Sequence, residues 1–117
     1  MSTIRIYDVL EMVLQSVKEE KNCAFEPDAC KLALLEKECA ALDRLANQCD
    51  ATGFEVDVNE TSGEVTISLD VVFSLAVVRS DRSLLQLLEE NTKSFSINKT
   101  DMQDIIRLTI VFESLWA

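Results

Sequence analysis

The four cysteines of the chain, Cys23, Cys30, Cys39 and Cys49, are crowded into a stretch of 27 residues, and thiolates are the side chains that bind zinc or exchange electrons. Most of that stretch has a helical pattern. On an ideal helix, Cys30 and Cys39 lie on opposite sides and about 13 Å apart along the axis, and Cys39 lies about 15 Å from Cys49. These separations are too long for a shared metal ion or a disulfide. Only Cys23, which precedes the helix, is free to approach Cys30. We therefore predict that Cys39 and Cys49 are small hydrophobes on a packing seam, and we expect no metal and no cofactor.

Other chemistry-bearing patterns are sparse. The chain contains no histidine, which removes the commonest general base and the histidine-dependent nucleophile and zinc sites. Residues 57–68 place oxygen ligands at alternate positions, as in a calcium loop. They fail at Ser62, where that loop needs glycine, and at Ser68, where it needs glutamate, so we interpret 59–63 as a hairpin loop. These observations favour a non-enzymatic role.

Composition sets the broad class. With 117 residues, 48% of them hydrophobic, the chain fits one domain, in which a helical hairpin at about 8–50 precedes a sheet with one helix at about 53–117. The net charge of -10 comes without any basic cluster, so we expect no direct nucleic-acid binding and an attraction to basic partners. The start lacks the pattern of a secretion signal and no stretch is apolar enough to span a membrane, so we expect a cytoplasmic protein with no membrane contact.

Two helices are predicted in the first half. Asp8 is assigned as the N-cap of a helix that ends near Lys21, with Glu11 completing a capping box. The second helix is expected from about Pro27 to Asp50, with Asp28 stabilising its first turn. It carries two apolar strips. The first is Leu32, Leu35, Cys39, Leu42, Ala46 and Cys49, and the second is Leu34, Ala41 and Leu45. Two strips indicate two neighbours, one of them the first helix and the other a sheet or a second copy of this chain.

After Gly53 the hydrophobic period changes from 3.6 to 2, which predicts strands. Residues 54–58 form the first. Large apolar residues then occupy every odd position from Val65 to Val77, which favours a strand bent near 70–73, although a short helix starting at Val71 is the rival interpretation. A helix over 82–91 and a strand over 94–97 follow. Residues 105–116 follow a capping-box pattern at Thr100 and Gln103, which favours a helix, but they alternate and their β-branched content favours a strand. The predicted fold is α+β: a helical hairpin followed by β-β-α-β-β, with the helices on one face of an antiparallel sheet.

Two functional hypotheses follow. The first is a non-enzymatic protein-interaction module that forms a homodimer, binds a basic protein, or does both. In a sharper version it inhibits a basic nucleic-acid-handling protein, as a mobile-element or anti-defence protein would. Its candidate partner-binding residues are Leu34, Ala41 and Leu45 on the helix, Glu55 and Asp57 on one strand face, and Trp116 near the end. The alternative is a small-ligand sensor or small enzyme, with a site near Asp70 and Arg107 that lies between the sheet and the helices or at a dimer interface.

Overall fold

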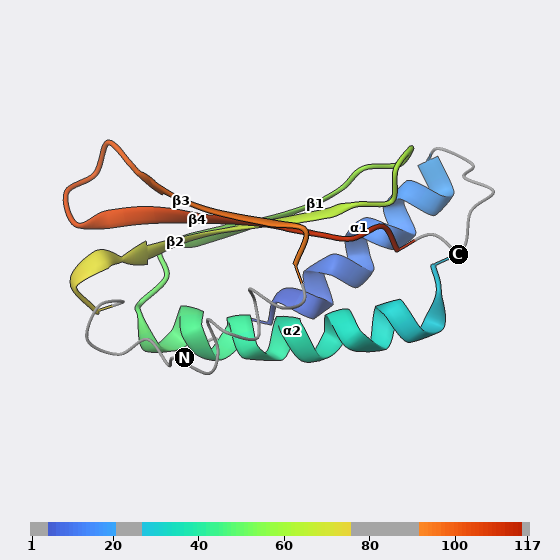
Figure 1. Ribbon diagram of the computed structural model, residues 1–117, viewed down its shortest axis with the longest axis horizontal. Coiled ribbons are helices and arrows are strands. Elements are labelled where there is room, and N and C mark those ends of the chain that lie inside the picture. Colours follow the sequence, from blue (N-terminus) through green and yellow to red (C-terminus); the bar gives the residue numbers. More distant parts are fainter. Residues whose placement is uncertain (1–4, 21–26, 76–91, 116–117) are drawn as a thin grey trace.

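The computed structural model describes residues 5–20, 27–75 and 92–115, which form two helices and then a four-stranded antiparallel sheet (Figure 1). Along the chain they are α1 (Ile6–Glu20), α2 (Ala29–Gln48), β1 (Gly53–Val58), β2 (Val65–Val72), β3 (Ser94–Lys99) and β4 (Ile105–Phe112). The strand order is β1-β2-β4-β3. The predicted α+β arrangement is confirmed. The strand expected over 105–116 is observed as β4, whereas the helix expected over 82–91 lies outside the described residues.

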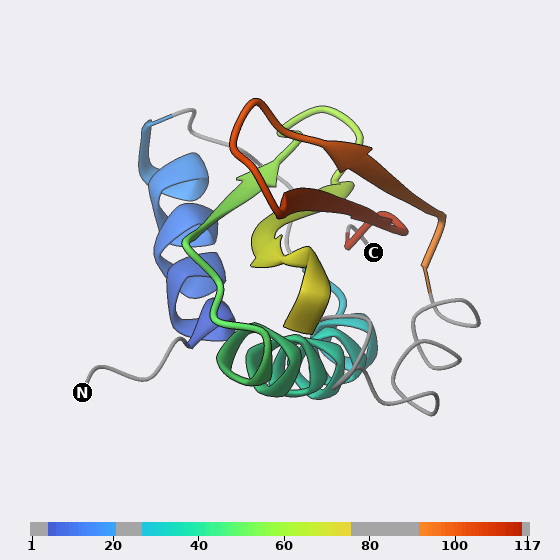
Figure 2. The ribbon, with the colours of Figure 1, turned by 90° about the vertical axis from the view of Figure 1, so that its left-hand side faces the viewer.

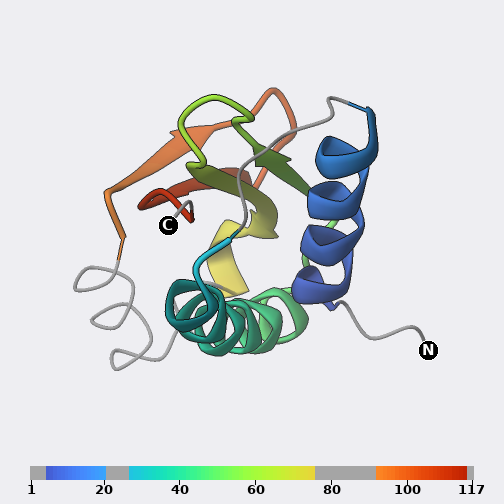
Figure 3. The same cartoon turned by 90° about the vertical axis from the view of Figure 1, so that its right-hand side faces the viewer.

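The alternation read from the sequence separates the two faces of the sheet. Ile67 pairs with Val56 of β1 on one side and with Ile110 of β4 on the other, and this row faces the helices. The next row, with Ser68 opposite Thr109, faces away from them. Figures 2 and 3 show α2 lying across the inner face and α1 standing beside β1. The core is therefore a single layer between α2, α1 and the inner face of the sheet.

The first helix begins differently from the prediction. It starts at Ile6, so that Asp8 lies inside the first turn and is not the N-cap. The amide of Ile6 donates a hydrogen bond of 2.8 Å to Asp43 Oδ1 on α2. A side chain from a distant part of the chain thus satisfies one of the free amides of the first turn. The capping-box prediction considered only neighbours in sequence and missed this acceptor.

The second helix has its N-cap at Asp28, whose side chain accepts hydrogen bonds from the amides of Cys30 and Lys31. Asp28 therefore caps the helix and does not lie in its first turn, so the helix starts two residues later than expected. The Asp28 amide donates to the carbonyl of Leu115 at 2.7 Å. This bond ties the start of α2 to the segment that follows β4. Neither of the helices described is long and apolar enough to cross a membrane.

The long alternating run ends as a strand at Val72, not at Val77. Val72 pairs with Ile105, the first residue of β4, so that beyond it the strand has no partner on that side. Beyond Val72 the backbone is bonded to Asp104 instead. The Asp104 carbonyl accepts a hydrogen bond from the Phe73 amide, and its carboxylate accepts from the amide and the hydroxyl of Ser74 at 3.1 and 2.7 Å. Residues 73–75 are helical. The rival helical interpretation is thus the correct one for these residues, and 76–77 lie outside the described part of the chain.

Candidate functional site

Two of the three described cysteines are residues of the hydrophobic core. Cys39 and Cys49 are fully buried in the core, as predicted, and Cys30 is exposed on the first turn of α2. Burial, together with the nearby carboxylates of Asp43, Glu38 and Glu36, raises the pKa of the Cys39 thiol to about 12. Such a thiol stays protonated and is a poor nucleophile.

The predicted partner-binding residues divide into two groups. Leu34 is 47% exposed, and Glu55 and Asp57 are exposed on the outer face of β1. Ala41 and Leu45, by contrast, are buried in the core, so assigning them to a partner surface was wrong. These two residues of the second strip belong to the protein's own core, which the sequence pattern alone could not distinguish from a contact with a second copy. Trp116 lies outside the described residues.

Asp70 and Arg107 come together, as expected for directly opposed residues of β2 and β4. Arg107 Nε donates to Asp70 Oδ1 at 2.8 Å and its Nη2 donates to Oδ2 at 3.2 Å. The hydrogen bonds to Asp70 raise the pKa of the Arg107 guanidinium above its ordinary value. The pair lies on the face of the sheet that points away from the helices. The prediction of a site between sheet and helices at these two residues is therefore wrong.

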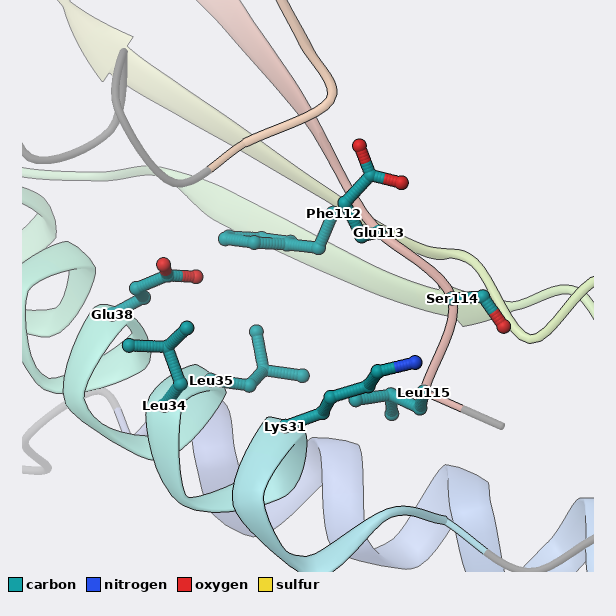
Figure 4. A pocket seen from close by; sticks show the side chains of 8 residues that line it. All are labelled: Lys31, Leu34, Leu35, Glu38, Phe112, Glu113, Ser114 and Leu115. Atoms are coloured by element: carbon teal, nitrogen blue, oxygen red, sulfur yellow. The ribbon is translucent and has the colours of Figure 1, made fainter. Parts of the chain in front are cut away.

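A cavity between sheet and helix does exist, but at another carboxylate. It has a volume of about 120 Å³ and lies between the first half of α2 and the end of β4. Figure 4 shows the Glu38 carboxylate pointing from α2 toward the ring of Phe112. The residues around the cavity are mostly apolar: Leu34, Leu35, Phe112 and Leu115, with Glu38, Lys31, Glu113 and Ser114.

Glu38 is the unusual group of this cavity. It is only 2% exposed, and its Oε1 has no hydrogen-bond partner among the residues that the structure describes. Desolvation by burial raises the pKa of its carboxyl from 4.5 to about 7. The sequence carried a signal that the prediction missed, because Glu38 occupies the position between Leu34 and Ala41 in the second apolar strip. A carboxylate at that position is placed among core residues whenever the strip is buried.

A second candidate surface is the outer edge of the sheet at β3. All six residues of this strand are exposed, including Phe95 at 39% and Ile97 at 57%. Their partners on β4, Ile110 and Leu108, are buried, so both side chains lie on the inner, apolar face. Because β3 is the last strand in the sheet order, no described strand pairs with its other edge.

The hydrogen-bond pattern shows which backbone groups that edge presents. The Thr100 amide donates to the carbonyl of Ile105, the residue opposite it in the register of β3 and β4. Bonded and non-bonded pairs alternate along an antiparallel ladder, so the even-numbered residues of β3 bond to β4. The N–H and C=O groups of Phe95, Ile97 and Lys99 therefore point away from the sheet, beside the exposed side chains. No protein-family model, curated protein or solved structure matches the chain.

Proposed function

We propose that this chain is a non-enzymatic protein-interaction module that self-associates by adding a second copy of β3 to the open edge of its sheet. The observation that carries the proposal is the edge itself. Outward-facing backbone groups lie beside two exposed apolar side chains, Phe95 and Ile97, and no described strand covers them; an edge of this kind is a template for strand addition. Such a role requires no catalytic group, in keeping with the lack of histidine.

The charge distribution favours a second copy as the occupant. A chain of net charge -10 repels itself over most of its surface. The segment 92–112, however, has three basic residues, Lys93, Lys99 and Arg107, and only two acidic ones, Asp101 and Asp104. It is therefore the part of the sheet where two copies approach each other with the least repulsion. The Lys93 ammonium also forms an ion pair with the carboxylate of Glu64, with 2.6 Å between Nζ and Oε1.

The register of such a dimer follows from the geometry of the edge. A two-fold axis at Ser96 places Phe95 opposite Ile97 of the second copy, and Ile97 opposite its Phe95. Both are residues with outward-facing backbone groups, so each of the two pairs forms two backbone hydrogen bonds. The side chains meet on the inner face as aromatic and β-branched neighbours, a pairing that stabilises antiparallel sheets.

Analytical ultracentrifugation of the purified chain over a concentration series tests the proposal. We expect a reversible monomer–dimer equilibrium. Ile97→Pro removes an outward-facing amide without removing a hydrogen bond to β4, so it abolishes the dimer. Ile97→Ala is the matched control: it shortens the same side chain but keeps the amide, so it weakens the dimer without abolishing it. A chain that is monomeric at every concentration, or a proline variant that dimerises as well as the alanine variant, contradicts the proposal.

The acidic hairpin favours a second candidate, the inhibition of a basic nucleic-acid-handling protein. Residues 53–72 contain five carboxylates and no basic residue, and Glu55 and Asp57 project from the same face of β1. Their spacing of about 7 Å is wider than the charge repeat of one nucleic-acid strand, about 3.4 Å, so this surface attracts a basic protein without reproducing a phosphate backbone. Pull-down of basic nucleic-acid enzymes by wild type and by Glu55→Gln/Asp57→Asn at low and high salt tests it. Binding that is insensitive to salt, or unchanged in the double variant, would sink this candidate.

We further propose a cytoplasmic location. Cys30 and Cys39, within the part of the chain that the structure describes, form no disulfide, which suits a reducing compartment. Fractionation of the source cells tests this assignment.

A further inference from the structure

The cavity beneath the end of β4 combines two properties that are rarely found together. Its walls include the apolar side chains of Leu34, Leu35, Phe112 and Leu115, yet the carboxylate of Glu38 lines it as well. A polar oxygen buried in an apolar environment without a hydrogen-bond donor is destabilising, and native structures contain few of them. Glu38 Oε1 is such an atom. The self-association at β3 gives it no role, since Glu38 lies on α2.

We propose that this cavity is a binding site for a short-chain primary ammonium group, whose nitrogen donates hydrogen bonds to the Glu38 carboxylate while its methylene groups contact Leu34, Leu35 and Leu115. An ammonium supplies what the carboxylate lacks, because it carries three donors and a compensating charge. Hydrogen bonds with an ionised partner are about twice as strong as neutral ones. The ring of Phe112, toward which Glu38 points, adds an aromatic surface that attracts cations.

The volume of the cavity limits the ligand. An apolar cavity of about 150 Å³ holds benzene, which has six carbon atoms. The 120 Å³ available beside Glu38 therefore suits roughly five non-hydrogen atoms, the size of n-butylammonium. The side chain of a lysine presents the same group, four methylenes and an ammonium. Two kinds of molecule thus present this alkylammonium group: a free alkylamine and a protein partner with an accessible lysine.

The charged groups around the opening are balanced. Lys31 on α2 and Glu113 just after β4 both line the cavity and carry opposite charges. In Figure 4 the Lys31 amine lies near Leu115, away from the Glu38 carboxylate. The Glu38 carboxylate therefore keeps its attraction for a cation that enters the cavity, and the net charge of -10 raises the local concentration of cations around the whole molecule.

Titration of the protein with n-butylamine hydrochloride, followed by the carboxyl carbon resonance of Glu38 in the NMR spectrum, tests the proposal. We expect saturable binding with a dissociation constant on the order of 1 mM, as suits a ligand of about five atoms. The bound ammonium favours the ionised carboxylate, so the pH midpoint of the Glu38 resonance falls from about 7 toward its ordinary value. n-Butanol, which has the same chain but no charge, binds at least tenfold more weakly.

Glu38→Gln keeps the shape of the side chain and removes its charge, so we expect amine binding to fall at least tenfold. Glu36→Gln, on the exposed side of the same helix, is the matched control and leaves binding unchanged. Equal binding of amine and alcohol, or a Glu38→Gln variant that binds the amine as wild type does, overturns the proposal, as does an unperturbed Glu38 resonance. Binding is read by amide and methyl resonances in the variants, which lack the carboxyl probe.

A blocked tripeptide, acetyl-Gly-Lys-Gly-amide, distinguishes the two sources. Binding of the peptide as tight as that of butylamine assigns the site to a protein lysine. Binding of butylamine without the peptide assigns it to free amines. The same peptide with norleucine in place of lysine lacks the ammonium and should bind more weakly than the lysine peptide. Equal binding of the two peptides contradicts the role of Glu38.

Discussion

The two hairpins of the sheet, β1–β2 and β3–β4, share one architecture but differ in what covers them. The helix α1 lies against β1, whereas no described element pairs with the outer edge of β3. The first hairpin carries only acidic charges, and those within its strands, Glu55, Asp57 and Asp70, lie on the outer face. The second has a small excess of basic residues and exposes Phe95 and Ile97 on the inner face. Charge protects the covered hairpin from self-association, and the open hairpin lacks that protection.

The comparison is tested most strongly by shortening one isoleucine in each hairpin. Ile67 of β2 is fully buried, whereas Ile97 of β3 is 57% exposed, although both lie on the inner face. We expect Ile67→Ala to lower the free energy of unfolding by about 2–5 kcal/mol, because it leaves a cavity, and Ile97→Ala to lower it by less than about 1 kcal/mol. Urea denaturation at a concentration where the protein is monomeric gives both values. Equal losses would mean that β3 is as well packed as β2.

Glu38 gives the next largest effect, because it is a carboxylate that faces the core and not the water. Its pKa in the folded protein, about 7, lies above its ordinary value of 4.5. The folded state therefore holds the proton more tightly than the unfolded state. This contribution to stability is complete below pH 4.5 and is lost as the pH rises through 7. The shift corresponds to roughly 3 kcal/mol.

We therefore expect Glu38→Gln to be more stable than wild type at pH 8 by up to about 3 kcal/mol, with the difference disappearing near pH 4. Urea denaturation at both pH values measures it. Asp57→Asn in the acidic hairpin is the matched control for the change of charge, since that carboxylate is exposed. A Glu38→Gln variant with the same stability difference at both pH values would show that burial does not perturb this carboxyl.

The smallest expected effect concerns Asp104, by which the loop of the second hairpin holds the end of the first. Asp104 has φ of 62° and accepts two hydrogen bonds from Ser74. Asp104→Ala loses both bonds and tolerates this backbone conformation poorly, so we expect a loss of about 1–2 kcal/mol. Asp104→Asn, which keeps an acceptor oxygen and accepts positive φ, should lose less than half of that. Thermal denaturation followed by circular dichroism measures the two variants side by side.

Much of this fold could be predicted from local pattern. The strand alternation identified the buried row of β2, and the loop at 59–63 was recognised from its polar composition. Apart from the start of α2, where Asp28 is the N-cap, the errors involve acceptors or neighbours from distant segments. Asp43 fixes the start of α1, and Asp104 turns the chain after Val72. Ala41 and Leu45 were assigned to a partner because a strip on a helix does not reveal what packs on it.

The candidate site was harder to predict than the fold. The residues whose types suggested a site were the cysteines, Asp70 and Arg107. Asp70 and Arg107 form an ion pair on the outer face of the sheet. Glu38 was not predicted as a site residue because charged residues are usually exposed. Its position in an apolar strip, however, indicates burial. The open edge of β3 could not be predicted, since strand order depends on pairings between segments far apart in the chain.

The strand order has a consequence for how the protein forms during synthesis. β4 is the last of the four strands along the chain, yet it lies between β2 and β3. As the ribosome releases the chain, β1 and β2 can pair at once, but the far side of β2 stays unsatisfied until β4 emerges. During that interval β2 presents an apolar strand with a free edge, the kind of intermediate that chaperones bind. Glu55 and Asp57 on the outer face of β1 precede β2 in the chain, and like charges of this kind disfavour the association of neighbouring nascent chains.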